Sequence, residues 1–228
     1  KDINDQELSN IRIAGLWQAS DDFSVKATAI QHRNEGGGPN FANLGSVADS
    51  NYRTAVDRTL SPSFTDDYDL YNLTASYEFN ATVLTSNSSY IDLDKARVGD
   101  SQFAIIPALS PTQETEVLEN RTEENAQVFS QEIRLNSLQN GRFTWTLGLF
   151  YSDLQRHRRF PGINAIQAGS ILIPFSNSDE DRFSESIAYF GDISYATTDR
   201  LTIGIGTRYF EDQRNFEKGG VQLPEVAF

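Results

Sequence analysis

Alternation of apolar and polar residues over 143–151, broken only at Phe150, constrains the fold of this chain more than any other feature. Phe143, Trp145, Leu147, Leu149 and Tyr151 occupy every second position there, and threonine and glycine lie between most of them. A period of two residues is typical of a β-strand whose two faces meet different surroundings. Sustained helical spacing is almost absent from the rest of the chain. The sequence therefore predicts an all-β protein.

Similar runs recur in pairs, which predicts four antiparallel hairpins. The pairs are 10–18 with 23–33, 68–79 with 81–92, 125–136 with 142–155, and 184–196 with 200–213. Within each pair the connection is short and carries turn residues. Between pairs the connections are long, over 34–67, 93–124 and 156–183. The alternation of short and long connections predicts an up-and-down transmembrane β-barrel segment of about eight long strands, with short periplasmic turns and long extracellular loops.

Charged residues in the middle of these runs alternate away from the apolar face. A charge that faces lipid at the membrane midplane costs roughly 2–4 kcal/mol, whereas a charge in a barrel lumen can find water or a partner. The pattern therefore favours a membrane barrel, with a structural role for its inward charges, which we expect to pair across strands in the lumen or against a plug domain. The inward charges with this expected role are Glu78, Glu132, Arg134, Asp192 and Arg208, and Arg12 and Lys26 alternate away from the apolar face in the same way.

Aromatic residues of the apolar face fall into two sets, as the two interfacial girdles of a membrane barrel would. One set lies near the tight turns: Trp17, Phe23, Tyr77, Phe79, Phe143, Trp145 and Tyr195. The other lies nearer the long loops: Tyr71, Tyr151, Tyr189 and Tyr209. Strand 81–92 fits this pattern least well, because Leu84 and Tyr90 share one face while Val83 and Ile91 share the other.

Composition excludes several classes of function. A net charge of −13 argues against nucleic-acid binding. The absence of cysteine removes disulfides, zinc–thiolate sites and iron–sulfur clusters, and two histidines are too few for a histidine metal centre. We therefore expect neither a cofactor nor catalysis. The chain lacks methionine and an apolar leader, so we expect a processed protein or a piece of a longer one, with any export signal upstream.

Four short segments resemble barrel strands of the TonB-dependent outer-membrane receptors. They are 129–135 (FSQEIRL), 143–151 (FTWTLGLFY), 188–195 (AYFGDISY) and 204–209 (GIGTRY). The resemblance implies a 22-stranded barrel closed by an N-terminal plug, preceded by an energy-coupling box. Neither plug nor box is recognisable in 1–228, so the chain looks like part of the barrel alone.

That resemblance also implies a function and its partners. The family takes up scarce ligands across the cell outer membrane, most often iron–siderophore complexes. Vitamin, metal and glycan ligands stay open. Uptake would be powered by the TonB complex acting through the missing plug, and the barrel would contact outer-membrane lipid and lipopolysaccharide.

Ligand contacts are expected in the long loops, because loops on a rigid barrel carry selectivity. The basic run Arg156, His157, Arg158 and Arg159 could hold an anionic ligand, or pair with lipopolysaccharide phosphates or nearby acids. Phe41, Tyr52 and Phe64 could stack on a ligand or serve only to fold the loops.

Two other architectures stay open on the sequence alone. The first is a complete eight-stranded outer-membrane barrel, with 10–18 paired to 200–213, acting as an adhesin, a surface-stability protein or a small membrane enzyme. The second is a soluble β-sandwich, such as a carbohydrate-binding module, whose apolar faces meet in a core.

Overall fold

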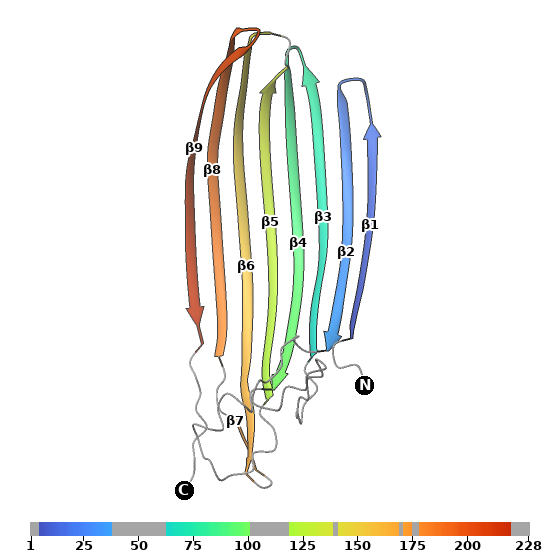
Figure 1. The fold of residues 1–228 in the computed structure, drawn as a ribbon, viewed down its shortest axis with the longest axis vertical. Coiled ribbons are helices and arrows are strands. Elements are labelled where there is room, and N and C mark those ends of the chain that lie inside the picture. The colour runs from blue at the N-terminus through green and yellow to red at the C-terminus, as the bar shows by residue number, and fades with distance from the viewer. Residues whose placement is uncertain are drawn as a thin grey trace, which may run out of the picture.

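The computed structural model describes residues 5–37, 63–100, 119–138, 141–168, 171–174 and 178–219, and these form one antiparallel sheet (Figure 1). Strand order along the sheet is β1-β2-β3-β4-β5-β6-β8-β9, with the short β7 paired to β6. The strands are β1 (Gln6–Gln18), β2 (Phe23–Gly37), β3 (Ser63–Phe79), β4 (Thr82–Asp100), β5 (Glu119–Ser137), β6 (Phe143–Ala168), β7 (Ile171–Pro174), β8 (Ser178–Thr198) and β9 (Leu201–Lys218).

This architecture confirms the all-β, up-and-down fold that the alternation predicts. Each of the eight expected runs lies in a strand that pairs antiparallel with its neighbours in the sequence, except that the runs 81–92, 142–155 and 200–213 begin one residue before theirs. The tight turns gather at one end of the sheet, and β1 begins and β9 ends at the other (Figure 1). Asn80 adopts a positive φ of 51° in the turn between β3 and β4, a conformation that asparagine tolerates better than most residues.

The strands extend further than the hydropathy pattern predicts. Residues 34–37, 63–67, 93–100, 119–124, 156–168 and 178–183 were expected in loops and lie in strands, as does the unexpected β7. Charged residues occur on both faces of these extensions where their side chains are described, so the alternation stops although backbone pairing continues. Charge pairs across neighbouring strands, such as Arg159 with Asp179, accompany that pairing.

The strand register aligns the apolar face of every strand on one side of the sheet. Among the inner strands β3–β8, every large apolar side chain that is exposed lies on this side, for example Leu147 at 58% and Tyr189 at 53%. The two buried side chains of the described core, Ala126 and Ala188, lie on the other side. Side chains spread apart on the outside of a curved sheet and crowd on the inside. We therefore call the apolar side the convex face and the other the concave face.

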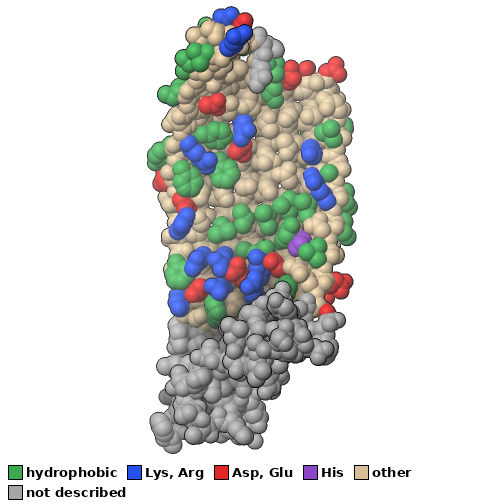
Figure 2. Space-filling view, viewed as in Figure 1, with side chains coloured by type: hydrophobic (Ala, Val, Ile, Leu, Met, Phe, Trp, Pro, Cys, Tyr) green, Lys and Arg blue, Asp and Glu red, His purple; other side chains and the backbone are tan. Residues whose placement is uncertain are grey.

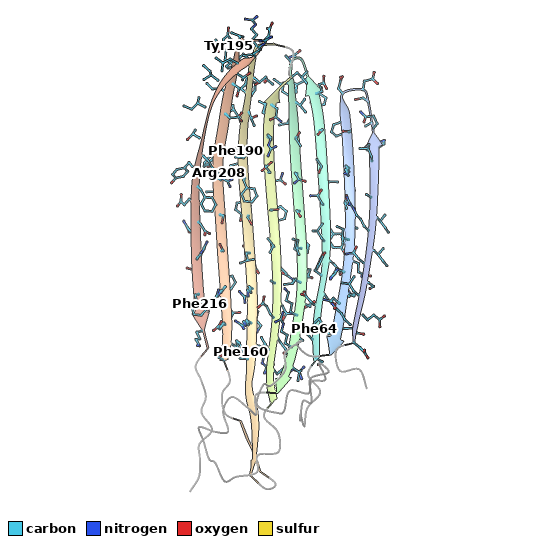
Figure 3. All side chains as sticks on the ribbon, in the orientation of Figure 1. Phe64, Phe160, Phe190, Tyr195, Arg208 and Phe216 are labelled. Carbon is cyan, nitrogen blue, oxygen red and sulfur yellow. The ribbon has the colours of Figure 1, made fainter. Side chains whose placement is uncertain are left out.

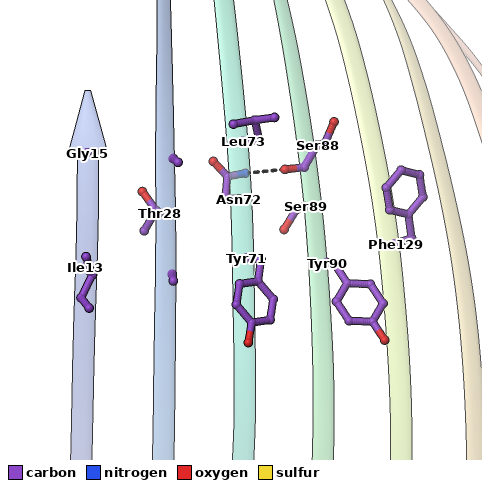
Figure 4. A pocket seen from close by; sticks show the side chains of 12 residues that line it. Ile13, Gly15, Thr28, Tyr71, Asn72, Leu73, Ser88, Ser89, Tyr90 and Phe129 are labelled. Atoms are coloured by element: carbon purple, nitrogen blue, oxygen red, sulfur yellow. Dashed lines mark hydrogen bonds between the residues drawn. The ribbon is translucent and has the colours of Figure 1, made fainter. Parts of the chain in front are cut away.

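The assignment of the two faces explains the mixed hydropathy pattern of β4. Leu84 and Tyr90 lie on the convex face, and Val83 and Ile91 lie on the concave face. Tyr90 stands in register between Tyr71 of β3 and Phe129 of β5 (Figure 4). These three rings border a shallow convex groove of about 460 Å³ with a floor of small residues from β1 and β2.

The sheet is open, and this bears on both alternative architectures. Strands β1 and β9 are its two edges and do not pair with each other in the described part of the chain, so the pairing of 10–18 with 200–213 that closes an eight-stranded barrel is not formed. The described strands make a single sheet, whereas a sandwich needs two packed sheets. No helix among the described residues is long and apolar enough to cross a membrane.

Candidate ligand-binding site

The predicted basic run does not form one cluster. It lies in β6 rather than in a loop, and because successive strand residues point to opposite faces, the run is divided between them. Arg156 and Arg158 belong to the concave face, and His157 and Arg159 belong to the convex face. Each pair therefore has its own surroundings.

On the convex face each basic side chain of this region lies beside an acid. His157 Nδ1 lies 2.6 Å from Asp181 Oδ1, and Arg159 Nε lies 3.7 Å from Asp179 Oδ1. Across the sheet, Arg33 Nη2 lies 3.0 Å from Asp69 Oδ1, two residues beyond Tyr71 towards the long loops. The hydrogen bond donated by Arg33 lowers the pKa of the Asp69 carboxyl below its ordinary value. These pairs leave little positive charge for a ligand.

On the concave face two arginines oppose each other. Arg156 of β6 is the register partner of Arg182 of β8. Arg156 Nη2 lies 2.5 Å from Glu124 Oε2, but no acid of the described residues lies within ion-pair distance of Arg182. The Arg182 guanidinium carbon instead lies 5.2 Å from the ring centroid of Phe216. Like charges directly opposite each other repel, so this position of the sheet is one anion short.

The next row towards the long loops is balanced. Register places Asp66, Lys95, Glu124, Arg158, Glu180 and Lys218 side by side across six strands, so acids and bases alternate. Lys95 Nζ lies 3.5 Å from Asp66 Oδ1, and Lys218 Nζ lies 3.9 Å from Glu180 Oε1. Opposite charges on neighbouring strands stabilise a sheet. The surplus of positive charge therefore centres on Arg156 and Arg182.

Two guanidinium groups here retain unused donors. The Nε atoms of Arg156 and Arg158 are shielded from solvent and have no hydrogen-bond acceptor among the described residues. The Arg158 guanidinium carbon also lies 4.3 Å from the ring centroid of Phe160, which holds the side chain over an aromatic face. Guanidinium donors of this kind bind carboxylate, phosphate and related oxyanions. Figure 2 shows lysine and arginine side chains gathered with acids beside the grey residues.

The predicted loop aromatics have different positions. Phe64 lies in β3 on the concave face, where a Cβ added to Gly36 would stand 2.9 Å from its ring (Figure 3). Phe64 therefore packs over a glycine of the neighbouring strand, and its expected loop location is wrong. Phe41 and Tyr52 lie outside the described residues.

The inward charges lie further towards the tight turns. Glu78, Glu132, Arg134, Asp192 and Arg208 all occupy the concave face. Glu132 and Arg134 form an ion pair of 2.6 Å along one strand, rather than across strands. Phe190, near Arg208 in Figure 3, covers Gly148 so closely that a Cβ there would stand 2.1 Å from its ring.

The predicted aromatic girdles both lie on the convex face. Between them, the convex positions of the eight long strands carry no charged residue. Their main polar group is a cluster in which Gln131 Nε2 donates to Ser86 Oγ at 3.0 Å and Ser88 Oγ donates to Gln131 Oε1. These polar side chains satisfy one another within an apolar surface.

Sequence reasoning missed Arg182, Lys95, Phe160 and Phe216 as site residues. Arg182 and Phe160 fall in segments that hydropathy places in a loop, where face and neighbour are undefined. Continuing the antiparallel register of β6 and β8 outward from 155 and 184 would have paired Arg156 with Arg182. Within the described ranges, no group of three or more histidine, aspartate or glutamate side chains is arranged to hold a metal ion.

Comparison with known proteins places the fold among outer-membrane barrels. The sheet is similar to the crystal structure of the ferric yersiniabactin uptake receptor FyuA from Yersinia pestis, with a TM-score of 0.65 and 15% sequence identity. The match covers 93% of this chain but only 30% of that receptor, so the chain spans less than a third of its length. No family model matches the sequence, and no curated protein matches it.

Proposed function

We propose that this chain is part of the barrel of an outer-membrane receptor that takes up an anionic small molecule, with an iron–siderophore complex as the first candidate. The observation that carries the proposal is the pair of opposed arginines, Arg156 and Arg182, on the concave face near the long loops. An anion bound between them would supply the missing negative charge and accept hydrogen bonds from their guanidinium groups.

The two faces support a membrane location. An uncharged convex surface bordered by two aromatic rows suits acyl chains with head groups on either side. We place this surface in outer-membrane lipid, with the charged strand extensions beyond Tyr71 and Tyr151 at the level of lipopolysaccharide. The concave face, with its charges in mid-strand, then lines the lumen.

The open edges support a barrel that continues beyond 1–228. Two unpaired edge strands are a liability in an isolated sheet, and neighbouring strands of a larger barrel would cover both. We propose that other segments of the same protein supply those strands and a plug domain, through which the TonB complex drives transport. The described sheet contributes one wall of the transport path.

Intact mass and energised uptake test this function. The protein extracted from native outer membranes should have a mass far above 25.5 kDa, roughly 80 kDa or more for a 22-stranded barrel with a plug. Cells that carry it should accumulate radioactive iron from a ferric chelate, and a protonophore should abolish this accumulation. A mass near 25.5 kDa, or uptake that the protonophore leaves unchanged, would contradict the proposal.

A further inference from the structure

A band of apolar side chains crosses the concave face, although the rest of that face is largely polar. Register aligns Ile30, Leu70, Ile91, Val128 and Leu154 in one row over β2 to β6. The band is visible in Figure 2 as hydrophobic side chains that cross the middle strands. These side chains are half-buried, and an apolar row on an otherwise largely polar face indicates a contact surface for a bound partner.

The band leads directly to the opposed arginines. The next row continues it with Tyr68, Leu93 and Ala126, and Ala126 is the register partner of Arg156. The Tyr68 ring stacks on His32, with centroids 4.7 Å apart. Apolar contact surface and unmatched positive charge therefore adjoin on one wall, with no charged residue between Ala126 and Arg156.

We propose that the ligand is an amphipathic anion, with an aromatic or apolar body that lies on the band and an anionic group held by Arg156 and Arg182. This inference rests on the proposed uptake function and narrows its substrate class. An aliphatic, strongly hydrated anion would use the arginines but leave the band exposed to water. A neutral apolar molecule would not reduce the repulsion between the two guanidinium groups.

Two features of the wall favour an aromatic body. Arg158 lies beside the Phe160 ring, and Arg182 lies beside the Phe216 ring. Guanidinium groups of this wall therefore already contact aromatic faces. A flat anionic ring could contact a guanidinium plane and the band together. Burial of its apolar surface then adds to affinity in proportion to the area removed from water.

Paired ferric complexes provide the test on the full-length receptor. Ferric tris(2,3-dihydroxybenzoate) is an aromatic anion, and ferric citrate is an aliphatic one. We expect the aromatic complex to bind at least tenfold more tightly. The double variant Ile91→Thr/Val128→Thr keeps β-branched side chains but removes apolar surface from the band, and should weaken binding of the aromatic complex by about tenfold while that of ferric citrate changes little. Val83→Thr, on the same face near the tight turns, should change neither.

The outcomes separate this inference from the proposed function. Tighter binding of ferric citrate, or equal weakening of both complexes by the band substitutions, would overturn the amphipathic ligand and leave iron uptake standing. Failure of both complexes to bind, and of cells to accumulate either, would count against the proposed iron uptake itself. A lower melting temperature of the double variant with unchanged binding would show that another part of the protein covers the band, which also overturns the inference.

Discussion

Arg156 and Arg182 lie directly opposite each other on neighbouring strands of the concave face, and Arg182 has no acidic partner among the described residues. The nearby basic side chains of the convex face, His157 and Arg159, each lie beside an aspartate of the next strand. On the concave face Arg156 and Arg158 both lie within ion-pair distance of the same acid, Glu124. Two opposed guanidinium groups, of which only Arg156 has an acidic partner, lower the stability of the sheet but raise its affinity for an anion.

Replacing Arg182 by glutamine should separate these two effects. Arg182→Gln removes the repulsion with Arg156, so the melting temperature of the full-length protein should stay level or rise. Hydrogen bonds to charged groups contribute about 1.5–3 kcal/mol, so affinity for an anionic ferric chelate should fall by about 10- to 100-fold. Titration calorimetry in detergent would measure the chelate affinity of the wild type and of Arg182→Gln.

Arg159→Gln is the matched control for that substitution. It removes the same charge from the convex face, where Asp179 already neutralises Arg159. Chelate affinity should change less than twofold. If Arg159→Gln weakens binding as much as Arg182→Gln does, net charge alone determines affinity and the opposed pair has no special role.

Gly148 should tolerate no side chain while Phe190 covers it. The ring atoms lie 2.1–2.6 Å from the position of an added Cβ, so Gly148→Ala must displace the ring at a cost of about 1–3 kcal/mol. Heat modifiability on semi-native gels should show a lower unfolding temperature. Gly148→Ala/Phe190→Ala should recover part of the loss, and Gly15→Ala, with open space around it, should be neutral. Equal effects at Gly148 and Gly15 would contradict this packing.

Charge placed on the two faces of β6 should have opposite consequences. Leu147→Lys puts an ammonium group on the convex face, which costs roughly 2–4 kcal/mol near the midplane of lipid. Thr146→Lys puts the same group on the concave face opposite Asp192 and should be tolerated. Folded protein recovered from outer membranes measures assembly for each variant. Similar recovery of both would show that the convex face does not contact lipid.

Acid should weaken the outer end of the sheet through Asp69. Its pKa is lowered in the folded protein by the hydrogen bond from Arg33, so the ionised carboxylate stabilises the fold above the unfolded pKa, near 4. That contribution is lost as pH falls through the lowered pKa. The melting temperatures of wild type and Asp69→Asn should therefore differ at pH 6 and converge as the pH falls through the lowered pKa. A difference that is constant with pH would exclude the ion pair as its cause.

Alternation predicted the strands and their faces well, because convex and concave positions differ in polarity between Phe143 and Tyr151. From Asp153 to Arg159 charged residues occupy both faces, so the pattern ends while β6 continues to Ala168. The sequence showed a basic run but did not show that its residues divide between the two faces. That division depends on strand structure in a segment that has no alternation. Arg182 became a site residue only through its register with Arg156, which no local pattern reports.

The orientation of the two faces is the central claim, and lipid quenching along β6 measures it most directly. The chain has no cysteine, so Leu147→Cys, Leu149→Cys, Thr146→Cys and Ser152→Cys can each carry one bimane label in the full-length protein, with any cysteine elsewhere replaced. In bilayers of nitroxide-labelled lipid we predict strong quenching at Leu147 and Leu149 and little at Thr146 and Ser152. Equal quenching at all four positions, or quenching at none, would contradict the account.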